Sequence, residues 1–410
     1  MSAAPTWAIE DFGDTRRVAA LQLEGTGDAL LGHRTFWLSD YAVHRETVHR
    51  ETAASGIWIS SIKGFDRGLF NGECVNYAGT KSFFLSWGAN FNYFSGFEYL
   101  NVFPLYDWRS VPGTTIELFP GSSTLSCGGS LGPKYRGSSH FVGGVDAKEM
   151  QMGLFAFNMT PVRAATLQAH KSWFFLGDSS LIVCVDELRA ENPIITTLEQ
   201  SWADGPKAHG ITIKRGQTKV SGSSFSNGAF VYSALSAGVA LEGFVERRAA
   251  NWTVVAEEYG DYPSSAGDVF TLSFAHGAKA GPLCYSVSLA NAVASFPAPE
   301  IVRSKSATAV SRGKDVTQVV FWESDSITLS SGHKLHASAP CVLVARTIAV
   351  GRWRVWVADP SRELQSLTVE IESSTGGKHC GRWEVPLPNG TAIGSTIAGS
   401  IDCGGQSHPY

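Results

Sequence analysis

The 410-residue sequence is poor in charge, and what it lacks excludes several classes of protein. Charged residues make up only 17% and the formal net charge is −4, so there is no basic surface of the kind that binds nucleic acid or an anionic membrane. No apolar run is long enough to span a bilayer, and the N-terminal stretch shows no apolar segment typical of a signal peptide. We therefore expect neither a nucleic-acid nor a membrane partner.

The seven cysteines form no CxxC pair and show no spacing typical of metal ligands. Cys184, Cys284 and Cys341 lie in apolar, strand-like runs and are interpreted as buried thiols. Cys380 and Cys403 lie in a polar region and can pair with each other if the protein is secreted. His44 and His49 are five residues apart, on opposite faces of a strand, which favours a solvated edge over a metal site.

What is abundant is glycine, with 43 residues, and aromatic residues at 11%, a mixture typical of a turn-rich β protein. A helix-like pattern occurs only in residues 14–33, and successive strand-like runs follow from residue 34 without βαβ alternation. Pro297 and Pro299 begin a linker to a smaller β unit, in which the run GRWRVWV puts Trp353 and Trp356 on opposite faces of one strand. We expect an all-β protein with domains at 34–296 and 297–375, a short helical segment at 1–33 and a tail at 376–410.

Residues 56–115 contain the strongest functional signal. A β-type run at 57–62 leads into a loop, residues 64–76, and a second β-type run is expected at 82–87, followed by an aromatic tract. The loop carries Asp66, Arg67, Asn71, Glu73 and Asn76. Amide and carboxylate groups beside aromatic faces suit a sugar polymer, because sugar hydroxyls need polar partners and sugar rings present apolar faces.

Each of these residues also has a structural interpretation. Asn71 is either a substrate contact or a turn-former before glycine, Glu73 either a cleft carboxylate or half of an ion pair, and Arg67 either a uronate ligand or a solvated loop residue. The aromatic residues Trp87, Tyr93 and Trp108 are candidate sugar platforms, although core packing is favoured for each. His170 and His276 are interpreted as hydrogen-bonded structural histidines.

Several motifs occur in an order that resembles polysaccharide lyase family 8, the hyaluronate, chondroitin AC and xanthan lyases. They are VHRE near residue 43, Ser60-Ser61 followed after nine residues by NGE, VPGTT at 111–115, FVGGV at 141, KSWFF at 171, ITTLEQ at 195, FAHG at 274 and VADPS at 357. The resemblance extends from about residue 33 to 372.

The resemblance implies a galactose mutarotase-like antiparallel super-sandwich over 34–296, a smaller C-terminal β-sandwich over 297–375 and, at 1–33, the remnant of a helical domain. It implies an extracellular enzyme that cleaves acidic polysaccharides of the hyaluronan, chondroitin or xanthan type by β-elimination, with no cofactor. The proton beside the uronate carboxylate becomes acidic only when the developing negative charge is stabilised, and a general base must then remove it.

The family's catalytic Asn, His and Tyr lie on an α/α toroid upstream of the matched region, so the resemblance assigns no catalytic residue to this chain. We therefore expect the chain to be inactive or incomplete without a separate or upstream toroid domain. The alternative is a non-catalytic carbohydrate-binding or structural β protein derived from the lyase scaffold.

The resemblance assigns substrate binding to the loop after the Ser60-Ser61 strand, and thus to Arg67, Asn71, Glu73 and Asn76. The sequence keeps Asn71 and Glu73 of the family pattern. It departs from the pattern where Lys63 replaces an Arg, Gly68 a Glu and Cys74 an Asn, and Asp66 replaces that Glu only if the loop shifts its register. The lost Glu supports the catalytic group in the family, which further disfavours turnover by this chain.

Overall fold

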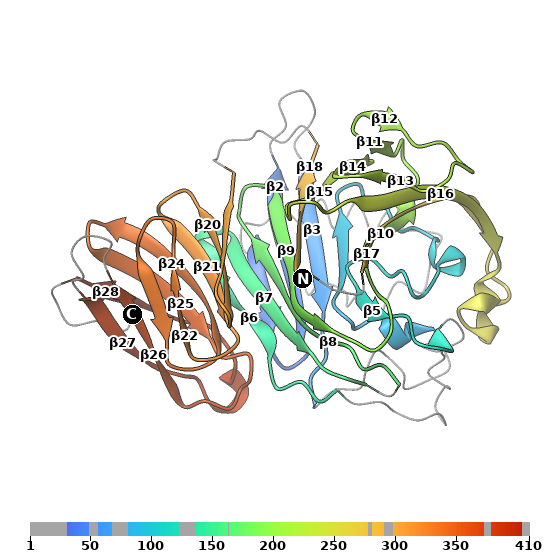
Figure 1. Cartoon of the computed structure of the whole chain (residues 1–410). Helices are drawn as coiled ribbons and strands as arrows, with labels where there is room; N and C mark the ends of the chain where they lie inside the picture. Colours follow the sequence, from blue (N-terminus) through green and yellow to red (C-terminus); the bar gives the residue numbers. More distant parts are fainter. Residues whose placement is uncertain are drawn as a thin grey trace, which may run out of the picture.

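The structure is a computed structural model that describes residues 31–48, 56–67, 81–122, 137–162, 164–277, 281–290, 298–372 and 379–403. In this part of the chain the strands form antiparallel sheets connected by turns and short 3-10 segments, which confirms the all-β expectation (Figure 1). The helix expected within residues 14–33 lies almost wholly outside the described residues. None of the described helices is long and apolar enough to cross a membrane.

The large domain begins with a four-stranded sheet in the order β1 (Gly32–Phe36), β2 (Tyr41–Val48), β3 (Gly56–Lys63) and β4 (Ala89–Tyr93). Burial alternates strictly along β2, so His44 and Glu46 point inward while Arg45 lies on the outer face. His44 is fully buried and stacks on Phe175 with ring centroids 4.3 Å apart, so the expected solvated edge is wrong for this histidine. His49 lies outside the described residues.

Two further sheets complete the super-sandwich. One has the order β13 (Val220–Gly222), β16 (Leu241–Ala250), β17 (Ser265–His276), β10 (Ile194–Trp202), β5 (Thr115–Glu117). The other has the order β12 (Ile211–Thr212), β11 (Lys207–Ala208), β14 (Ser224–Asn227), β15 (Phe230–Ala234), β18 (Leu283–Leu289), β9 (Ser180–Arg189), β8 (Gln168–Phe175), β7 (Met152–Met159), β6 (Val142–Ala147). One apolar cluster, which includes Trp58, Phe155 and Leu272, joins all three sheets.

The strand expected at residues 82–87 is wrong. Ser82–Phe84 is a 3-10 turn, η5, and β4 starts only at Ala89 after Gly88, whose φ is +77°. The turn buries Phe83, Phe84 and Trp87 in the main core. The β-type composition of residues 82–87 therefore indicates that their rings are buried. A tight turn buries them as well as a strand does.

Other short 3-10 segments join the strands: η6 (Phe103–Leu105), η9 (Lys148–Met150), η10 (Trp252–Val254), η11 (Glu257–Tyr259) and η12 (Gly390–Ala392). The segment η6 lies within the aromatic tract, whose rings pack on one another in a separate cluster. Within that cluster Tyr99 and Tyr106 are buried, whereas Tyr93 and Trp108 are only partly buried.

The C-terminal domain is a sandwich of two sheets. The first has the order β19 (Glu300–Arg303), β20 (Ala307–Arg312), β21 (Val316–Phe321), β24 (Cys341–Ala349), β25 (Arg352–Ala358), β28 (Ile397–Asp402). The second has the order β22 (Asp325–Thr328), β23 (Lys334–Ala337), β26 (Ser366–Glu372), β27 (His379–Pro386). Residues 379–402, assigned above to a tail, instead supply β27 and β28, one to each sheet.

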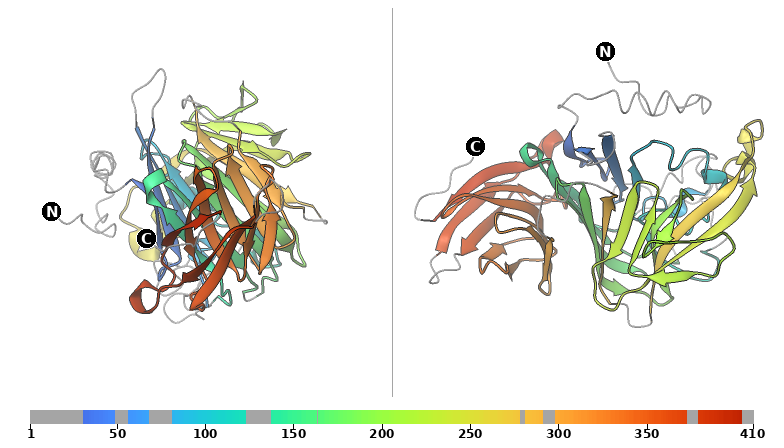
Figure 2. Two further views of the ribbon diagram at one scale, coloured as in Figure 1. Left: turned by 90° about the vertical axis from the view of Figure 1, so that its left-hand side faces the viewer. Right: turned by 90° about the horizontal axis from the view of Figure 1, so that it is seen from above.

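The two domains share an apolar interface, in which the outer face of β6–β9 meets the outer face of the six-stranded C-terminal sheet (Figures 1 and 2). Trp356 belongs to this interface while Trp353 lies inside the C-terminal core, as the alternation of their strand predicts. Cys184 and Cys284, paired opposite each other on β9 and β18, form a disulfide, so the expectation of two free thiols is wrong. Cys341 is free and buried, as expected.

Candidate functional site: the base of the loop after β3

The candidate loop leaves β3 through Gly64–Arg67, and a short turn between β1 and β2 holds its first residues. The Gly64 N–H donates to the carbonyl oxygen of Asp40 at 2.9 Å, and the Asp66 N–H donates to Asp40 Oδ2 at 2.7 Å. Asp40 has φ +47°, a left-handed conformation that aspartate tolerates in turns. This turn therefore sets the direction in which the loop starts.

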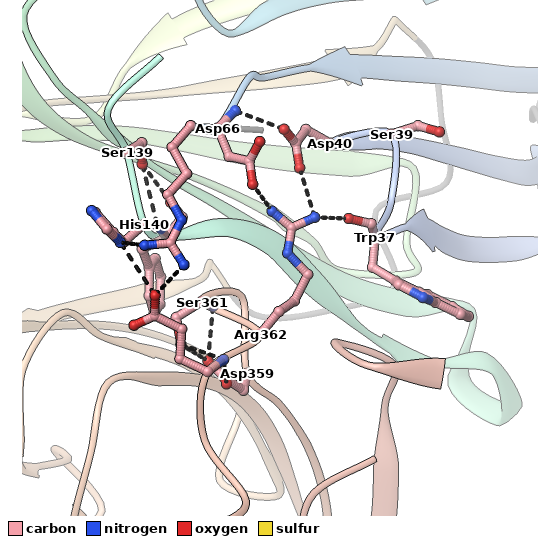
Figure 3. A network of polar contacts seen from close by, with 12 residues as sticks. Trp37, Ser39, Asp40, Asp66, Ser139, His140, Asp359, Ser361 and Arg362 are labelled. Carbon is pink, nitrogen blue, oxygen red and sulfur yellow. Dashed lines mark hydrogen bonds and ion pairs between the residues drawn. The ribbon is translucent and has the colours of Figure 1, made fainter. Parts of the chain in front are cut away.

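An arginine of the C-terminal domain clamps the same point (Figure 3). The Arg362 guanidinium donates to Asp40 Oδ1 at 3.2 Å and to the carboxylate of Asp66 and the carbonyl oxygen of Trp37. Asp40 is fully buried and the side chains of Arg362 and Asp66 are each 14% exposed. Burial and the neighbouring Asp66 carboxylate raise the pKa of Asp40 to about 6, against the opposing charge of Arg362.

The VADPS motif explains how Arg362 reaches this position. Asp359 Oδ1 accepts hydrogen bonds from the backbone N–H and hydroxyl of Ser361, and its Oδ2 accepts from the N–H groups of Glu363 and Leu364. This capped turn holds Arg362 at φ +60° (Figure 3). A motif in the C-terminal domain thus orients the first residues of a loop of the super-sandwich.

Of the predicted substrate-binding residues, only Arg67 lies in the part of the chain that the structure describes; Asn71, Glu73 and Asn76 lie outside it. The Arg67 backbone N–H donates to Ser139 O at 3.1 Å, and its guanidinium contacts Glu363 Oε1 and His140 Nδ1, each at 2.5 Å. Half of the Arg67 side chain is exposed. Arg67 is therefore a partly solvated loop residue held by an ion pair across the domain boundary.

The other positions named from the sequence differ in how far they are buried and in what they contact. Asp66, the possible replacement for the family Glu, is bound to Arg362, and Lys63 Nζ donates to Ser39 O at 2.7 Å. Trp87 is 1% exposed, so its core interpretation holds. Tyr93 and Trp108 keep part of their surface, and their role as sugar platforms stays a prediction.

Four of the sequence motifs meet in one buried polar network between the sheets. Lys171, from KSWFF, donates to Gly113 O and to Thr115 Oγ1 at 2.9 Å, both in VPGTT. Thr115 Oγ1 lies 2.9 Å from Thr196 Oγ1, in ITTLEQ, which lies 2.8 Å from His276 Nε2, in FAHG. Burial lowers the pKa of Lys171 to about 7 and that of His276 to about 4. The expectation for His276 is confirmed: it is a buried, hydrogen-bonded histidine.

A second buried group, Glu199, was missed at the sequence level. Its Oε2 accepts hydrogen bonds from Tyr99 at 2.9 Å and from Tyr232, and its Oε1 accepts from the Gln200 N–H at 2.9 Å. Burial raises the pKa of Glu199 to about 7, because three hydrogen bonds only partly offset the loss of water. The only sequence signal was its place in the strand-like motif ITTLEQ.

The polar groups described so far hold and orient the loop base and the sheets. Among the residues that the structure describes, no three His, Cys, Asp or Glu side chains gather as a metal site requires. The buried acid and amine lie inside the sandwich, each bonded to protein groups. Cys403 is disulfide-bonded, while the Cys380 side chain lies outside the described set and its pairing stays a prediction.

Fold and loop geometry define the class: a β super-sandwich with an attached β-sandwich that braces a polar loop. The model of the super-sandwich domain of polysaccharide lyase family 8 matches residues 31–298, and that of the family's C-terminal beta-sandwich domain matches residues 301–368. The chain belongs to polysaccharide lyase family 8.

The chain is similar to known lyases in sequence and to solved lyase structures in fold. Chondroitinase-AC of Pedobacter heparinus is 24% identical over 387 residues, which cover 89% of this chain and 51% of the relative. A solved chondroitinase AC lyase superposes with a TM-score of 0.75 at 23% identity, covering 92% of this chain and 55% of that one. A Paenibacillus xanthan lyase gives 0.72 at 17% identity, covering 92% and 38%. The chain thus spans about half the length of the curated relative it matches.

Proposed function

We propose that this chain forms the β-domain wall of a cleft in which an acidic, uronate-containing polysaccharide of the hyaluronan, chondroitin or xanthan type is cleaved by β-elimination. The loop after β3 supplies the wall, and Arg67, Asn71, Glu73 and Asn76 are its proposed contacts. The observation that supports the proposal is the Arg362 clamp: its ion pairs with the buried Asp40 and the largely buried Asp66 make the loop start in one defined direction. The proton-transfer groups belong to a helical domain, so the 410 residues alone bind without turnover.

The first test is catalytic. The purified chain, incubated with hyaluronan, chondroitin and xanthan, is followed by the absorbance of the unsaturated uronate product. We expect no product from these 410 residues alone and product when a family helical domain is supplied in one polypeptide. Clear turnover by the isolated chain would show that the proton-transfer groups lie within it.

The second test uses the charge of Arg67. Arg67→Ala should weaken binding of chondroitin about three- to ten-fold, since a charge-assisted hydrogen bond to a carboxylate is lost. Glu363→Gln should strengthen binding, because it removes the carboxylate that competes for Arg67. The ion pair between Arg354 and Glu149 is a matched surface control, and Arg354→Ala and Glu149→Gln should leave affinity unchanged.

The departures of the loop from the family pattern favour a second candidate, a non-catalytic glycan-binding protein on the same scaffold. Lys63, at the position of the family Arg, bonds back to Ser39 O, and Asp66 is bound by Arg362. Chondroitin binding that Asn71→Ala abolishes, with no turnover after a helical domain is added, would select this candidate. Absence of any affinity for acidic polysaccharide would exclude both.

An extracellular location is part of the proposal. The disulfide between Cys184 and Cys284 and the disulfide-bonded Cys403 suit an oxidising compartment. In the denatured protein, added reductant should release more thiols than denaturation alone exposes, since denaturation by itself already exposes the buried Cys341. Equal thiol counts with and without reductant would contradict this assignment.

A further inference from the structure

Exposure distinguishes His140 from the histidines inside the super-sandwich. Burial lowers the pKa of His170 and that of His276 to about 4, so both imidazoles are neutral near pH 7. The Nδ1 of His170 is buried without a hydrogen-bond partner in the described part of the chain, contrary to the hydrogen-bonded histidine expected from the sequence. The side chain of His140, in contrast, is 56% exposed and contacts one cation and one anion at the domain boundary.

These two charged neighbours meet the same ring nitrogen of His140. Arg67 Nη1 lies 2.5 Å from His140 Nδ1, and Glu363 Oε1 lies 3.3 Å from it. Arg67 Nη2 donates to the same Glu363 oxygen at 2.5 Å, so the three side chains form a closed triangle (Figure 3). One nitrogen cannot serve both neighbours at once, because Nδ1 accepts from Arg67 only when its lone pair is free and donates to Glu363 only when it carries a proton.

The protonation state of His140 therefore decides which contact it makes. The neutral imidazole with its proton on Nε2 accepts from Arg67, and Arg67 also pairs with Glu363. The protonated imidazole has no acceptor for Arg67, repels its guanidinium and donates to Glu363. Histidine side chains ordinarily change charge between pH 5 and 8. The hydrogen bond from His140 and the charge of Arg67 hold the pKa of Glu363 below its usual value, so Glu363 stays an anion over this range.

Backbone contacts keep the three side chains within reach of one another. The Arg67 N–H donates to Ser139 O at 3.1 Å, which joins the loop base to the residue before His140. The Glu363 N–H donates to Asp359 Oδ2 at 3.0 Å. Because both backbones are held, we expect protonation of His140 to change side-chain contacts and to leave the course of the loop base unchanged.

The other charged groups of this boundary are bound elsewhere. The Arg362 guanidinium donates to Asp40 and Asp66, and Asp359 accepts from the backbone of its own turn. Among the described residues, the charged side chains in contact with His140 are thus Arg67, from the loop base, and Glu363, from the turn after β25.

We propose that His140 is a positioning residue that, when protonated, takes Glu363 from Arg67 and leaves the Arg67 guanidinium free for a carboxylate of the polysaccharide. The inference rests on the proposed function, in which Arg67 is a contact of the cleft wall. A carboxyl of ordinary pKa, about 4, stays ionised above pH 5, so the polysaccharide keeps its charge while histidine gains one. The affinity of the chain for acidic polysaccharide therefore rises as pH falls through the range in which histidine is protonated.

The control of Arg67 by His140 is tested first without polysaccharide, by ¹H–¹⁵N spectra of the full chain between pH 5 and 8. His140→Gln identifies the His140 ring signals, and Arg67→Ala identifies the Arg67 side-chain signal. We expect the Arg67 signal to shift with the same midpoint as the protonation of His140 Nδ1, and His140→Gln to abolish this shift. An Arg67 signal that does not follow the titration of His140 would overturn the proposal.

The second measurement is the affinity for chondroitin at constant ionic strength. It should rise about two- to five-fold from pH 7.5 to 5.5, the effect of releasing one exposed ion pair. His140→Gln should remove the rise because the amide stays neutral, and Glu363→Gln should remove most of it because Arg67 then has no competing carboxylate. His209→Gln is the matched control: His209 is exposed, lies between β11 and β12, and accepts from the Ser223 N–H at 3.2 Å. It should leave the rise intact.

The variants also separate His140 from other groups that titrate nearby. Burial raises the pKa of Asp40 to about 6, so only the part of the rise that His140→Gln removes belongs to His140. A rise that His140→Gln or Glu363→Gln leaves whole would reflect a general gain of positive charge and would contradict the inference. Absence of binding at every pH would contradict the proposed function and this inference with it, whereas binding of constant affinity would contradict the inference alone.

Discussion

The two sandwiches differ in what they bury. The super-sandwich encloses charged or titratable side chains in its interior, among them Lys171, Glu199, His33 and His44. In the described part of the C-terminal domain, Asp359 is the one buried residue with a charged side chain, and it caps a turn at the domain boundary. The C-terminal core is a continuous apolar cluster.

This difference in buried side chains distinguishes residues that only fill a core from residues that also fix the relative position of strands. An apolar interior needs only the right shape, whereas each buried polar group needs a partner in a fixed direction and so constrains the strands that supply it. In the super-sandwich these constraints hold together the strands that carry the family motifs. The C-terminal domain contributes polar groups at its boundary, where Arg362 and Glu363 meet the loop base.

The largest loss of stability should come from removing the Arg362 ion pairs at the domain boundary. Arg362→Ala leaves the buried Asp40 without its cation and should cost about 3–5 kcal/mol of unfolding free energy. Urea denaturation measures it, and Asp40→Asn in the same chain should recover part of the loss. A loss below about 1 kcal/mol would show that the clamp does not hold the domains together.

Core truncation compares the two interiors directly. Leu343→Ala in the C-terminal core and Leu272→Ala in the super-sandwich both remove fully buried side chains and should each cost about 2–5 kcal/mol. Because an apolar cluster joins the domains, we expect both variants to lower one common unfolding transition in calorimetry. Two transitions, each shifted by one variant alone, would contradict this coupling.

The polar interior should show itself in the pH dependence of stability. Burial raises the pKa of Glu199 from 4.5 to about 7, so between these values the folded state binds more protons than the unfolded state. Stability should therefore fall as pH rises through this window, by up to about 1.4 kcal/mol per pH unit. Glu199→Gln mimics the protonated acid and should flatten the slope in urea denaturation from pH 5 to 8; an unchanged slope would rule Glu199 out as its source.

The smallest effect on stability should come from the exposed edge of the boundary. Arg67 and Glu363 form an ion pair with side chains 50% and 45% exposed. Such pairs contribute about 0–1 kcal/mol, and less at high salt. Arg67→Ala should leave the urea midpoint nearly unchanged while weakening polysaccharide binding; a large loss of stability would instead make Arg67 a structural residue.

Much of the fold could be predicted from the sequence because strand period and turn residues are local signals. Alternation alone placed Trp353 and Trp356 on opposite faces. The same signals failed at residues 82–87, where buried rings lie on a turn, and at residues 379–402, where strands β27 and β28 have a glycine- and proline-rich sequence nearby. Burial of His44 was missed because an edge pattern and an inward-facing polar pattern look alike.

The sequence by itself determined the family, the antiparallel β class and the loop that carries the candidate contacts, since these depend on local pattern and motif order. Only the tertiary structure decided which distant residues meet: Asp40, Asp66 and Arg362 at the loop base, the Tyr99–Glu199–Tyr232 cluster and the Cys184–Cys284 bond. Which of these distant residues pair depends on sheet register and on how the two domains pack. The spacing of residues along one segment determines neither.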